Sequence, residues 1–310
     1  MSTARSSPLI CGHLDVNDGR GFISTSRVPE AEIAEARNTA LKSAAFDGII
    51  GPHDPEATVL YGHRTVIKVQ HRLHERFETA LRMESMRELA GLKVPALLDA
   101  GTVATSSGPR WWLVLERISG SPGEYPTPSQ QRSLGEQIRR WHDAGDSGGL
   151  RLDDPGALGV LFGSARALAP RSYPAISQLF DQACAGQPMT SIHADVAVGH
   201  NALFEGDDLM ALIDAGSVEV GPPMLDLAWC LAVDLPRGAH PQWLLEGYGT
   251  GAVDQKALDA LLPLMILRRL IDVQAEGLTE DSRWLAAWLA ANTPAFLSLA
   301  APTDLESSPG

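Results

Sequence analysis

Cysteine is scarce in this chain, and its three cysteines lie far apart. Cys11, Cys184 and Cys230 form no CxxC pair, so the sequence predicts neither a zinc site nor a disulfide framework. No stretch reaches the ~18 apolar residues that a membrane-spanning helix needs. The first residues, MSTARSSPLI, also lack the apolar core of a secretory signal. We therefore expect a cytoplasmic protein in a reducing environment, with no membrane partner.

Basic residues are also in short supply. Lys and Arg number 25 against 38 Asp and Glu, which gives a formal net charge of -13. This balance argues against a nucleic-acid partner, because phosphate binding requires clustered lysine and arginine. An acidic surface favours a cationic small molecule, although acidity also serves solubility alone, and both interpretations stay open. The 310 residues suffice for one large or two modest domains, and nothing indicates an obligatory protein partner.

The first third of the chain has the pattern of a small lobe rich in strands. Residues 29–45 predict a helix, with early glutamates and a late lysine, as the helix dipole prefers. Two β-branched runs, TVLYG and RTVIKV, meet at Gly62 and predict an antiparallel hairpin. A second helix is expected over RFETALRMESMRELAGL, ending at Gly91, and a further strand over WWLVL.

A connector rich in glycine and proline, GSPGEYPTP, separates this lobe from a mainly helical remainder. Beyond it, Thr127 can cap a helix that starts with Pro128 and carries Gln130 for a capping box. The tail is polar and is expected to be disordered. The predicted boundaries are an N-terminal lobe over 1–118 (with 1–28 as an extension), a helical lobe over 119–302 and a disordered tail over 303–310.

Four polar residues surround two short apolar runs in the helical lobe. The runs ALF and LMALID are separated by EGDD, a good turn sequence, and predict a hairpin. This hairpin would bring Asn201 beside Asp214, with His193 and Asp195 on the loop before it. Carboxylate and amide oxygens suit Mg²⁺, and a further carboxylate can accept a proton from a hydroxyl. The alternative is a polar turn between two strands.

Lys68 lies inside the apolar strand VIKV, where an ammonium group is costly unless it reaches a partner or an anion. Sixteen residues later, Glu84 lies on the helix that is expected to pack beside this strand. A strand lysine paired with a helix glutamate is how kinases hold the cation that binds nucleotide phosphates. Taken alone, Lys68 is more often a strand-edge lysine whose end reaches water.

Taken together, these segments resemble the aminoglycoside phosphotransferase family, the small-molecule branch of the protein-kinase-like fold. HADVAVGHNALF is similar to the family's catalytic loop, HGDxxxxNxLF, and IDAGSVEVGPPMLDLA to its metal-binding segment, IDxxxxxxGxPxxDLA. VLYGHRTVIKV, LVLERISG and LGEQIRRWHDAG are similar too, and the strand before Lys68 looks most like the hygromycin-modifying subgroup. The resemblance implies an α+β, bilobal protein-kinase-like fold, with a small antiparallel-sheet N-lobe and a mainly helical C-lobe.

The resemblance also implies residue roles around a nucleotide and a metal ion. Asp195 would be the catalytic base or would orient the substrate hydroxyl. Asn201 and Asp214 would bind Mg²⁺. Lys68 would contact the α- and β-phosphates of ATP or GTP, with Glu84 holding it in place.

Supporting roles are implied as well. His193 would brace the catalytic loop, and Asp226 would cap that loop from the following helix. Residues 113–117 would form the hinge strand, and backbone groups at Glu116 and Ile118 would bind the nucleotide base.

The chain departs from the family pattern at three places. Ala194 replaces the usual glycine, which matters if that residue needs a positive φ. The interval from Asp195 to Asn201 is one residue longer, with His200 at the expected asparagine position. We assign Asn201, because NALF continues the pattern, and expect the loop to bulge. No GxGxxG loop precedes Lys68, so only GIIGPHDPEA is available to cover the phosphates.

The implied function is transfer of a γ-phosphoryl group to a hydroxyl of a small molecule, an aminoglycoside or another sugar-bearing antibiotic. Carboxylates of the helical lobe, such as Asp272 and Glu276, could attract a cationic acceptor. Two alternatives stay open. One is a metabolic or biosynthetic kinase for a sugar, nucleoside or amino alcohol, and the other is a nucleotide-binding pseudokinase module.

Overall fold

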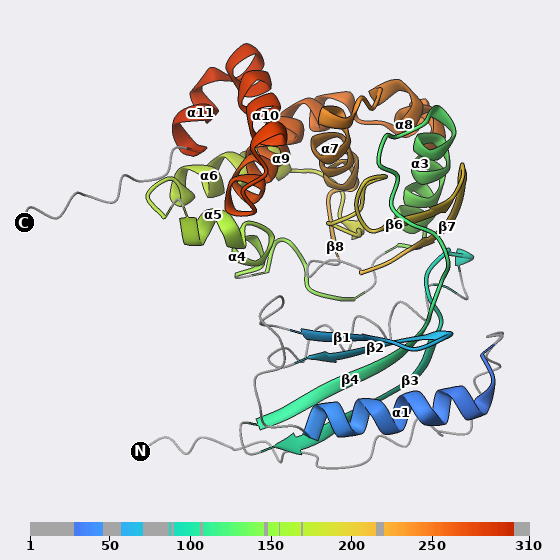
Figure 1. The fold of residues 1–310 in the computed structure, drawn as a ribbon. Helices are drawn as coiled ribbons and strands as arrows, with labels where there is room; N and C mark the ends of the chain where they lie inside the picture. Colours follow the sequence, from blue (N-terminus) through green and yellow to red (C-terminus); the bar gives the residue numbers. More distant parts are fainter. Residues whose placement is uncertain are drawn as a thin grey trace, which may run out of the picture. The chain divides into compact units, whose positions relative to one another are not determined.

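The chain forms two compact units. The computed structural model describes residues 28–45, 57–70, 87, 90–105, 108–145, 148–154, 156–168, 170–214 and 220–300. The first unit comprises Met1–Phe77 and Ala96–Arg117, and the second comprises Glu78–Pro95 and Ile118–Gly310 (Figure 1). Residues 78–95, which our sequence boundary assigned to the first lobe, thus belong to the second unit. The expected tail over 303–310, and the extension over 1–28 apart from Val28, lie outside the described residues.

An antiparallel sheet of four strands forms the centre of the first unit. Its members, in the spatial order β1-β2-β4-β3, are β1 (Ala57–Tyr61), β2 (Thr65–Gln70), β4 (Gly108–Glu116) and β3 (Leu97–Thr105). The hairpin expected at Gly62 is confirmed, because β1 and β2 pair antiparallel. β4 extends the expected strand WWLVL in both directions. β3 was not predicted, because LLDAGTVAT contains Asp and Gly, which are depleted in strands.

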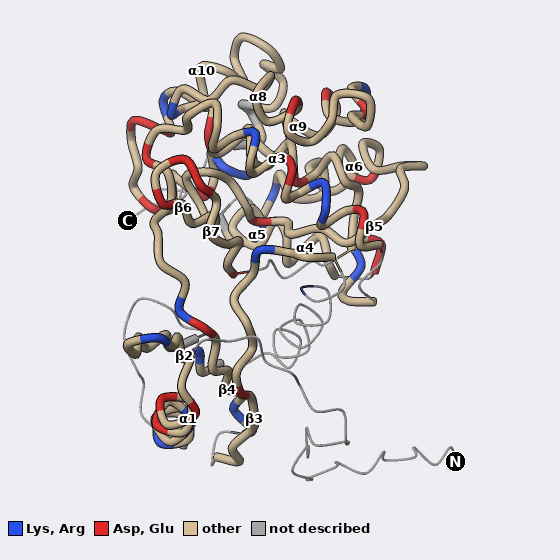
Figure 2. The backbone as a smooth tube through the Cα atoms, turned by 90° about the vertical axis from the view of Figure 1, so that its right-hand side faces the viewer, with Lys and Arg blue, Asp and Glu red and all other residues tan. Residues whose placement is uncertain are grey.

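Helix α1 (Glu30–Ala45) packs on one face of this sheet, and it lies where the sequence predicts a helix (Figure 1). Its small side chains pack against larger apolar residues of β2 and β4. The buried set is Ala36, Ala40, Ala44, Ile67, Val69, Trp112 and Val114. Figure 2 shows charges of both signs on α1, and Arg37 of this helix forms an ion pair with Asp99 of β3.

The other face of the sheet carries Lys68. The strand register places Lys68 opposite Val59 on β1 and Leu113 on β4, and directly opposed residues share a face. Ile67 and Val69, on either side of Lys68, belong to the core that α1 covers. Because successive strand residues alternate between faces, Lys68 lies among apolar side chains on the face away from α1.

The second unit is mainly helical. Its α-helices with defined bounds are α3 (Pro128–Asp143), α4 (Ala157–Leu161), α5 (Gly163–Leu168), α6 (Tyr173–Cys184), α7 (Pro223–Asp234), α8 (Pro241–Tyr248), α9 (Gln255–Ala275), α10 (Thr279–Asn292) and α11 (Pro294–Ala300). α3 starts as the sequence predicts, with Pro128 in its first turn and a complete capping box between Thr127 and Gln130. Nearly every residue of α7 is buried, so this helix lies in the core. No helix in the described part of the chain is long and apolar enough to span a bilayer.

Two short ribbons border the core of the second unit. β6 (Ala202–Glu205) and β7 (Asp208–Leu212) form the expected hairpin. β5 (Thr190–Ser191) pairs with β8 (Val220–Gly221), and this pairing was not predicted because two-residue strands leave no periodic pattern. The β5–β8 pair brings the residues before the HxD loop beside those before α7, so that loop and helix are close in space.

Candidate active site

The loop between β5 and β6 is held at its start by Asp226 of α7. The Asp226 carboxylate accepts the backbone N–H of His193 at 2.8 Å and that of Ala194 at 2.7 Å. The ring Nε2 of His142 lies 3.1 Å from the same carboxylate. Burial alone would raise the pKa of Asp226, but the hydrogen bond and charge of His142, with the N–H of His193, outweigh burial and lower it. Asp226 therefore caps this end of the loop as a buried carboxylate.

The far end of the loop is held by Asp234, the last residue of α7. Its carboxylate accepts the N–H of Val198 at 2.8 Å and that of Gly199 at 3.0 Å. Burial raises the pKa of Asp234 to about 6, although these two N–H groups act in the opposite direction. Sequence reasoning missed this residue. The one signal was an aspartate inside an apolar helix, a costly position unless it is paired.

Ala194 adopts the left-handed conformation, with φ of 63°. This is the position where the resemblance expects glycine, so the substitution places a side chain where an L-residue is strained. The carbonyl oxygen of Ala194 accepts a hydrogen bond of 3.1 Å from Nη1 of Arg268 on α9, and its N–H is bound by Asp226. The strained peptide is therefore fixed from both sides.

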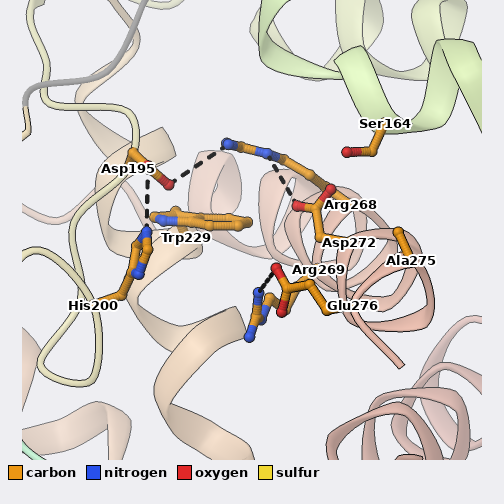
Figure 3. A pocket seen from close by; sticks show the side chains of 9 residues that line it. All are labelled: Ser164, Asp195, His200, Trp229, Arg268, Arg269, Asp272, Ala275 and Glu276. Carbon is orange, nitrogen blue, oxygen red and sulfur yellow. Dashed lines mark hydrogen bonds and ion pairs between the residues drawn. The ribbon is translucent and has the colours of Figure 1, made fainter. Parts of the chain in front are cut away.

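Asp195 follows directly, and the side chains of Asn201, His200 and Arg268 surround its carboxylate. Figure 3 shows His200 and Arg268 beside it. Asn201 donates from Nδ2 to the backbone oxygen of Asp195 at 2.9 Å and to Oδ2 at 3.2 Å. Nε2 of His200 lies 3.3 Å from Oδ2, and Nη2 of Arg268 lies 3.7 Å from Oδ1. The Asp195 side chain is 30% exposed, so it is oriented by its neighbours and still accessible to a ligand.

A tight turn absorbs the additional residue of the loop. The N–H of Ala197 donates to the carbonyl of His200 at 2.7 Å, and the reverse bond measures 3.0 Å. Asn201 rather than His200 binds the backbone of Asp195, although His200 also reaches the Asp195 carboxylate. The bulge therefore leaves Asn201 in contact with Asp195 and adds an imidazole on the same side.

His193 is buried behind the loop. Its Nε2 lies 3.1 Å from the carbonyl oxygen of Ile213, and its ring lies against Trp141 with centroids 5.1 Å apart. Burial lowers the pKa of His193, although the nearby carboxylates Asp226, Asp195 and Asp214 act to raise it. The neutral ring can therefore donate from Nε2 and link the loop to the end of β7.

Asn201 and Asp214 lie at the same end of the β6–β7 hairpin. The N–H of Ile213 donates to the carbonyl of Asn201 at 2.8 Å, and both Asn201 and Asp214 have left-handed backbones, with φ of 61° and 55°. Within the described residues, no group of three or more His, Cys, Asp or Glu side chains could hold a metal ion. A cation here would therefore have few protein ligands.

A cavity of about 340 Å³ opens beside Asp195. It is lined by Ser164, Asp195, His200, Trp229, Arg268, Arg269, Asp272, Ala275 and Glu276 (Figure 3). All of these residues belong to the second unit. Asp272 and Glu276 face the cavity together with Asp195 (Figure 3). Asp272 lies in the last turn of α9, and Glu276 is the C-cap of that helix.

The cavity also contains two arginines that the sequence did not single out. Arg268 lies over the ring of Trp229, with Cζ 3.9 Å from the centroid, and its Nε is 3.9 Å from Asp272. Nη1 of Arg269 is 3.6 Å from Glu276. The spacing of Arg268 and Asp272 at i and i+4 was a readable helix signal, but the sequence gives no sign that this helix reaches Asp195.

The remaining predicted residues lie elsewhere in the chain. Lys68 is on β2 in the first unit, and Glu84 lies outside the described residues. Glu116 ends β4, and its N–H donates to the carbonyl of Ala96 at 2.9 Å. Ile118 begins the second unit.

Comparisons with known proteins agree with this fold. The family model described as "Phosphotransferase enzyme family" matches residues 58–261, whereas the curated proteins give no match.

Among solved structures, spectinomycin phosphotransferase with ADP and spectinomycin is similar, at 16% identity over 81% of this chain and 87% of that chain, with a TM-score of 0.51. The same holds for a thermostable mutant of an aminoglycoside phosphotransferase with AMP-PNP and hygromycin B, at 16% identity over 79% and 94%, with a TM-score of 0.51. An aminoglycoside phosphotransferase from Alicyclobacillus acidocaldarius matches at 17% identity over 89% and 97%, with a TM-score of 0.52.

These likenesses establish the α+β, protein-kinase-like fold of aminoglycoside phosphotransferases, with its antiparallel-sheet unit and its helical unit. The family match covers more than half of the chain. The chain therefore belongs to the phosphotransferase enzyme family, as the catalytic-loop and metal-segment motifs had indicated.

Proposed function

We propose that this protein transfers the γ-phosphoryl group of ATP or GTP to a hydroxyl of a small sugar-bearing molecule, with antibiotics of the aminoglycoside type as the first acceptors to assay. The observation that carries this proposal is the carboxylate of Asp195. It lies at a small-molecule-sized cavity, is partly exposed, and is oriented by Asn201 and the loop contacts of α7. A metabolic or biosynthetic sugar kinase would use the same site, so the acceptor panel must include both classes.

Phosphoryl transfer requires little covalent chemistry from the protein, because positioning of the reactants and neutralisation of the phosphate charge provide most of the rate acceleration. The acceptor oxygen would attack the γ-phosphorus as the bond to the β-phosphate oxygen breaks, releasing the nucleoside diphosphate. The hydroxyl proton would pass to Oδ1 or Oδ2 of Asp195. Hydrogen bonds from backbone N–H groups of the loop to Asp226 and Asp234 would keep the loop in place during the transfer.

The residues at the hairpin end fit a magnesium ion. Asn201 turns Nδ2 towards Asp195, which leaves its Oδ1 as the possible ligand, and Asp214 supplies a carboxylate. Two protein oxygens suit Mg²⁺, which usually keeps several waters and takes its other ligands from substrate phosphates. When bound, the ion would neutralise charge on the phosphates.

The nucleotide would be bound largely by the first unit. Lys68 lies opposite Val59 and Leu113 on its sheet face, and apolar side chains beside one ammonium group suit a base and a phosphate tail. We assign the α- and β-phosphates to Lys68, with Glu84 as its partner, and the base to the backbone of Glu116 and Ile118.

The test is an acceptor panel with ATP or GTP and Mg²⁺. It should contain kanamycin, hygromycin B, spectinomycin, simple sugars, nucleosides and amino alcohols, with product detected by mass spectrometry and diphosphate release. For an active acceptor, Asp195→Asn should lower kcat by about 10²–10⁴-fold and leave nucleotide affinity unchanged. Asp153→Asn, which alters an exposed carboxylate outside the cavity, is the matched control. Nucleotide binding without transfer to any member would contradict the proposal and favour a pseudokinase module.

A further inference from the structure

The cavity beside Asp195 is not a simple acidic pocket. Three carboxylates line it, Asp195, Asp272 and Glu276, but so do the guanidinium groups of Arg268 and Arg269. The two arginine side chains are only 14% and 13% exposed. A polycation would therefore meet two buried positive charges and carboxylates that already have partners, at a cost in desolvation and repulsion.

Arg268 occupies the middle of this arrangement (Figure 3). Its guanidinium lies over the ring of Trp229 and reaches towards Asp195 on one side and Asp272 on the other. The two ion-pair distances, 3.7 Å and 3.9 Å, exceed hydrogen-bond length. A guanidinium has five N–H donors, and within the described residues Arg268 makes one hydrogen bond, from Nη1 to Ala194. Donors therefore remain at the cavity wall for oxygen atoms of a ligand.

The cavity also presents hydrogen-bond acceptors beside these donors. Asp195, Asp272 and Glu276 are acceptors, so donors and acceptors alternate around the cavity. A hydroxyl group both donates and accepts, which makes an uncharged polyhydroxyl compound the matching partner, whereas an ammonium group only donates. A volume of about 340 Å³ lies near the lower end of the ~300–1,000 Å³ range of small-molecule pockets, which favours a compact ligand.

We propose that Arg268 determines acceptor specificity, and that the acceptor group bound beside Asp195 is an uncharged polyhydroxyl sugar rather than a polyamine. The inference rests on the proposed function, since it assigns the acceptor class to the same site. It narrows the acceptor within that function: Arg268 binds hydroxyl oxygens next to the reacting hydroxyl and keeps Asp195 and Asp272 from binding ammonium groups.

Binding of matched sugars tests this directly, without relying on turnover. The probes are glucose with glucosamine, galactose with galactosamine, and kanamycin as the polyamine, each followed by saturation-transfer NMR at pH 7 with the intact protein. The uncharged member of each pair should bind at least fivefold more tightly than its amino counterpart. Equal or tighter binding of the amino sugars or of kanamycin, or no binding of any sugar, would overturn the inference.

Variants connect the preference to Arg268. Arg268→Gln should lose at least fivefold in affinity for the uncharged sugars and gain as much for the amino sugars, because it releases two carboxylates. Arg268→Lys keeps the charge without the planar fork, so it should lose affinity for the uncharged sugars yet still reject amines. If the Gln variant does not fold, the Lys variant tests the role of Arg268.

Arg132→Gln is the control, because Arg132 also lies on a tryptophan, 4.3 Å from the Trp243 ring centroid, and pairs with Glu246 outside the cavity. An unchanged preference in both Arg268 variants would overturn the inference.

Phosphate transfer, measured separately, distinguishes this inference from the proposed function. Binding of uncharged sugars with no transfer to any acceptor would refute the proposed function alone. Efficient transfer to kanamycin in preference to uncharged sugars would uphold the function and refute the role of Arg268.

Discussion

Asp226 and Asp234 lie at opposite ends of α7, and their carboxylates accept backbone N–H groups from the two ends of one loop. Asp195 lies between the two attachment points. A buried helix with two aspartates therefore acts as a rigid support for an exposed carboxylate, and hydrogen bonds to ionised groups are the stronger kind. The position of Asp195 should depend on both supports, even though neither faces the cavity.

Replacing Asp226 with Asn should damage both stability and activity. An amide offers one acceptor where the carboxylate supplies two, so its NH₂ group would face a backbone N–H or the ring of His142. Leaving a buried donor unsatisfied costs about 1–3 kcal/mol, and the displaced loop should lower kcat at least tenfold. Urea denaturation and steady-state kinetics would measure the two effects.

The control for that variant is Asp254→Asn. Asp254 also accepts a backbone N–H, from Ala257 at 3.1 Å, but as the N-cap of α9, where Asn serves equally well. Its free energy of unfolding should change by less than about 0.5 kcal/mol. If Asp226→Asn were equally mild, the support attributed to Asp226 would be wrong.

Asp234 should give the protein a distinctive pH dependence. Its pKa is raised to about 6 from the ordinary value of 3.8, so between these values the folded chain binds a proton that the unfolded chain has released. Its contribution to stability is thus fully present below pH 3.8 and is lost as the pH rises through about 6. Asp234→Asn does not titrate, so the variant should gain stability relative to the wild type as the pH rises from 4 to 7. The gain should be at most a few kcal/mol, at about 1.4 kcal/mol per pKa unit.

Parallel urea titrations of both proteins at pH 4, 5, 6 and 7 would measure this difference, since other carboxylates contribute equally to each. A difference that stays constant, or that favours the wild type as the pH rises, would show that Asp234 is ionised at all these values.

Ala194 should tolerate glycine and reject valine. A left-handed φ costs an L-residue about 1–2 kcal/mol, and Gly removes this cost while losing about 0.5–1 kcal/mol to the entropy of the unfolded chain. These terms nearly cancel, so Ala194→Gly should change stability by less than about 1 kcal/mol and retain activity. A β-branched side chain fits poorly at positive φ, and Ala194 is also buried, so Ala194→Val should lose more than about 2 kcal/mol. Thermal unfolding of both variants decides between them, and equal stability would contradict the backbone assignment.

Local signals predicted the elements that depend on local chemistry. The capping box of α3 and the two hairpins are set by residues a few positions apart, so the sequence alone indicates them. The site depends on longer connections that no spacing shows. Arg268 reaches Asp195 from a helix more than seventy residues later, and Asp234 binds Val198 only because α7 is buried beside the loop. Their assignment required the fold, since a lone arginine or aspartate in a helix has many possible roles.

Close packing of α3 on α8 should make two glycines indispensable. A Cβ atom built on Gly247 of α8 would lie 2.1 Å from the carbonyl oxygen of Arg132, and one on Gly135 of α3 would lie 2.3 Å from that of Leu244. Both obstacles are backbone atoms, so neither can rotate away, and Gly247→Ala or Gly135→Ala should force the helices apart at a cost of about 1–3 kcal/mol or more. Gly251→Ala is the matched control, because nothing lies within 4 Å of its Cβ position and its φ is not positive, so it should be neutral or slightly stabilising. Chemical denaturation of the three variants measures the difference, and equal stabilities would mean that α3 and α8 do not approach each other this closely.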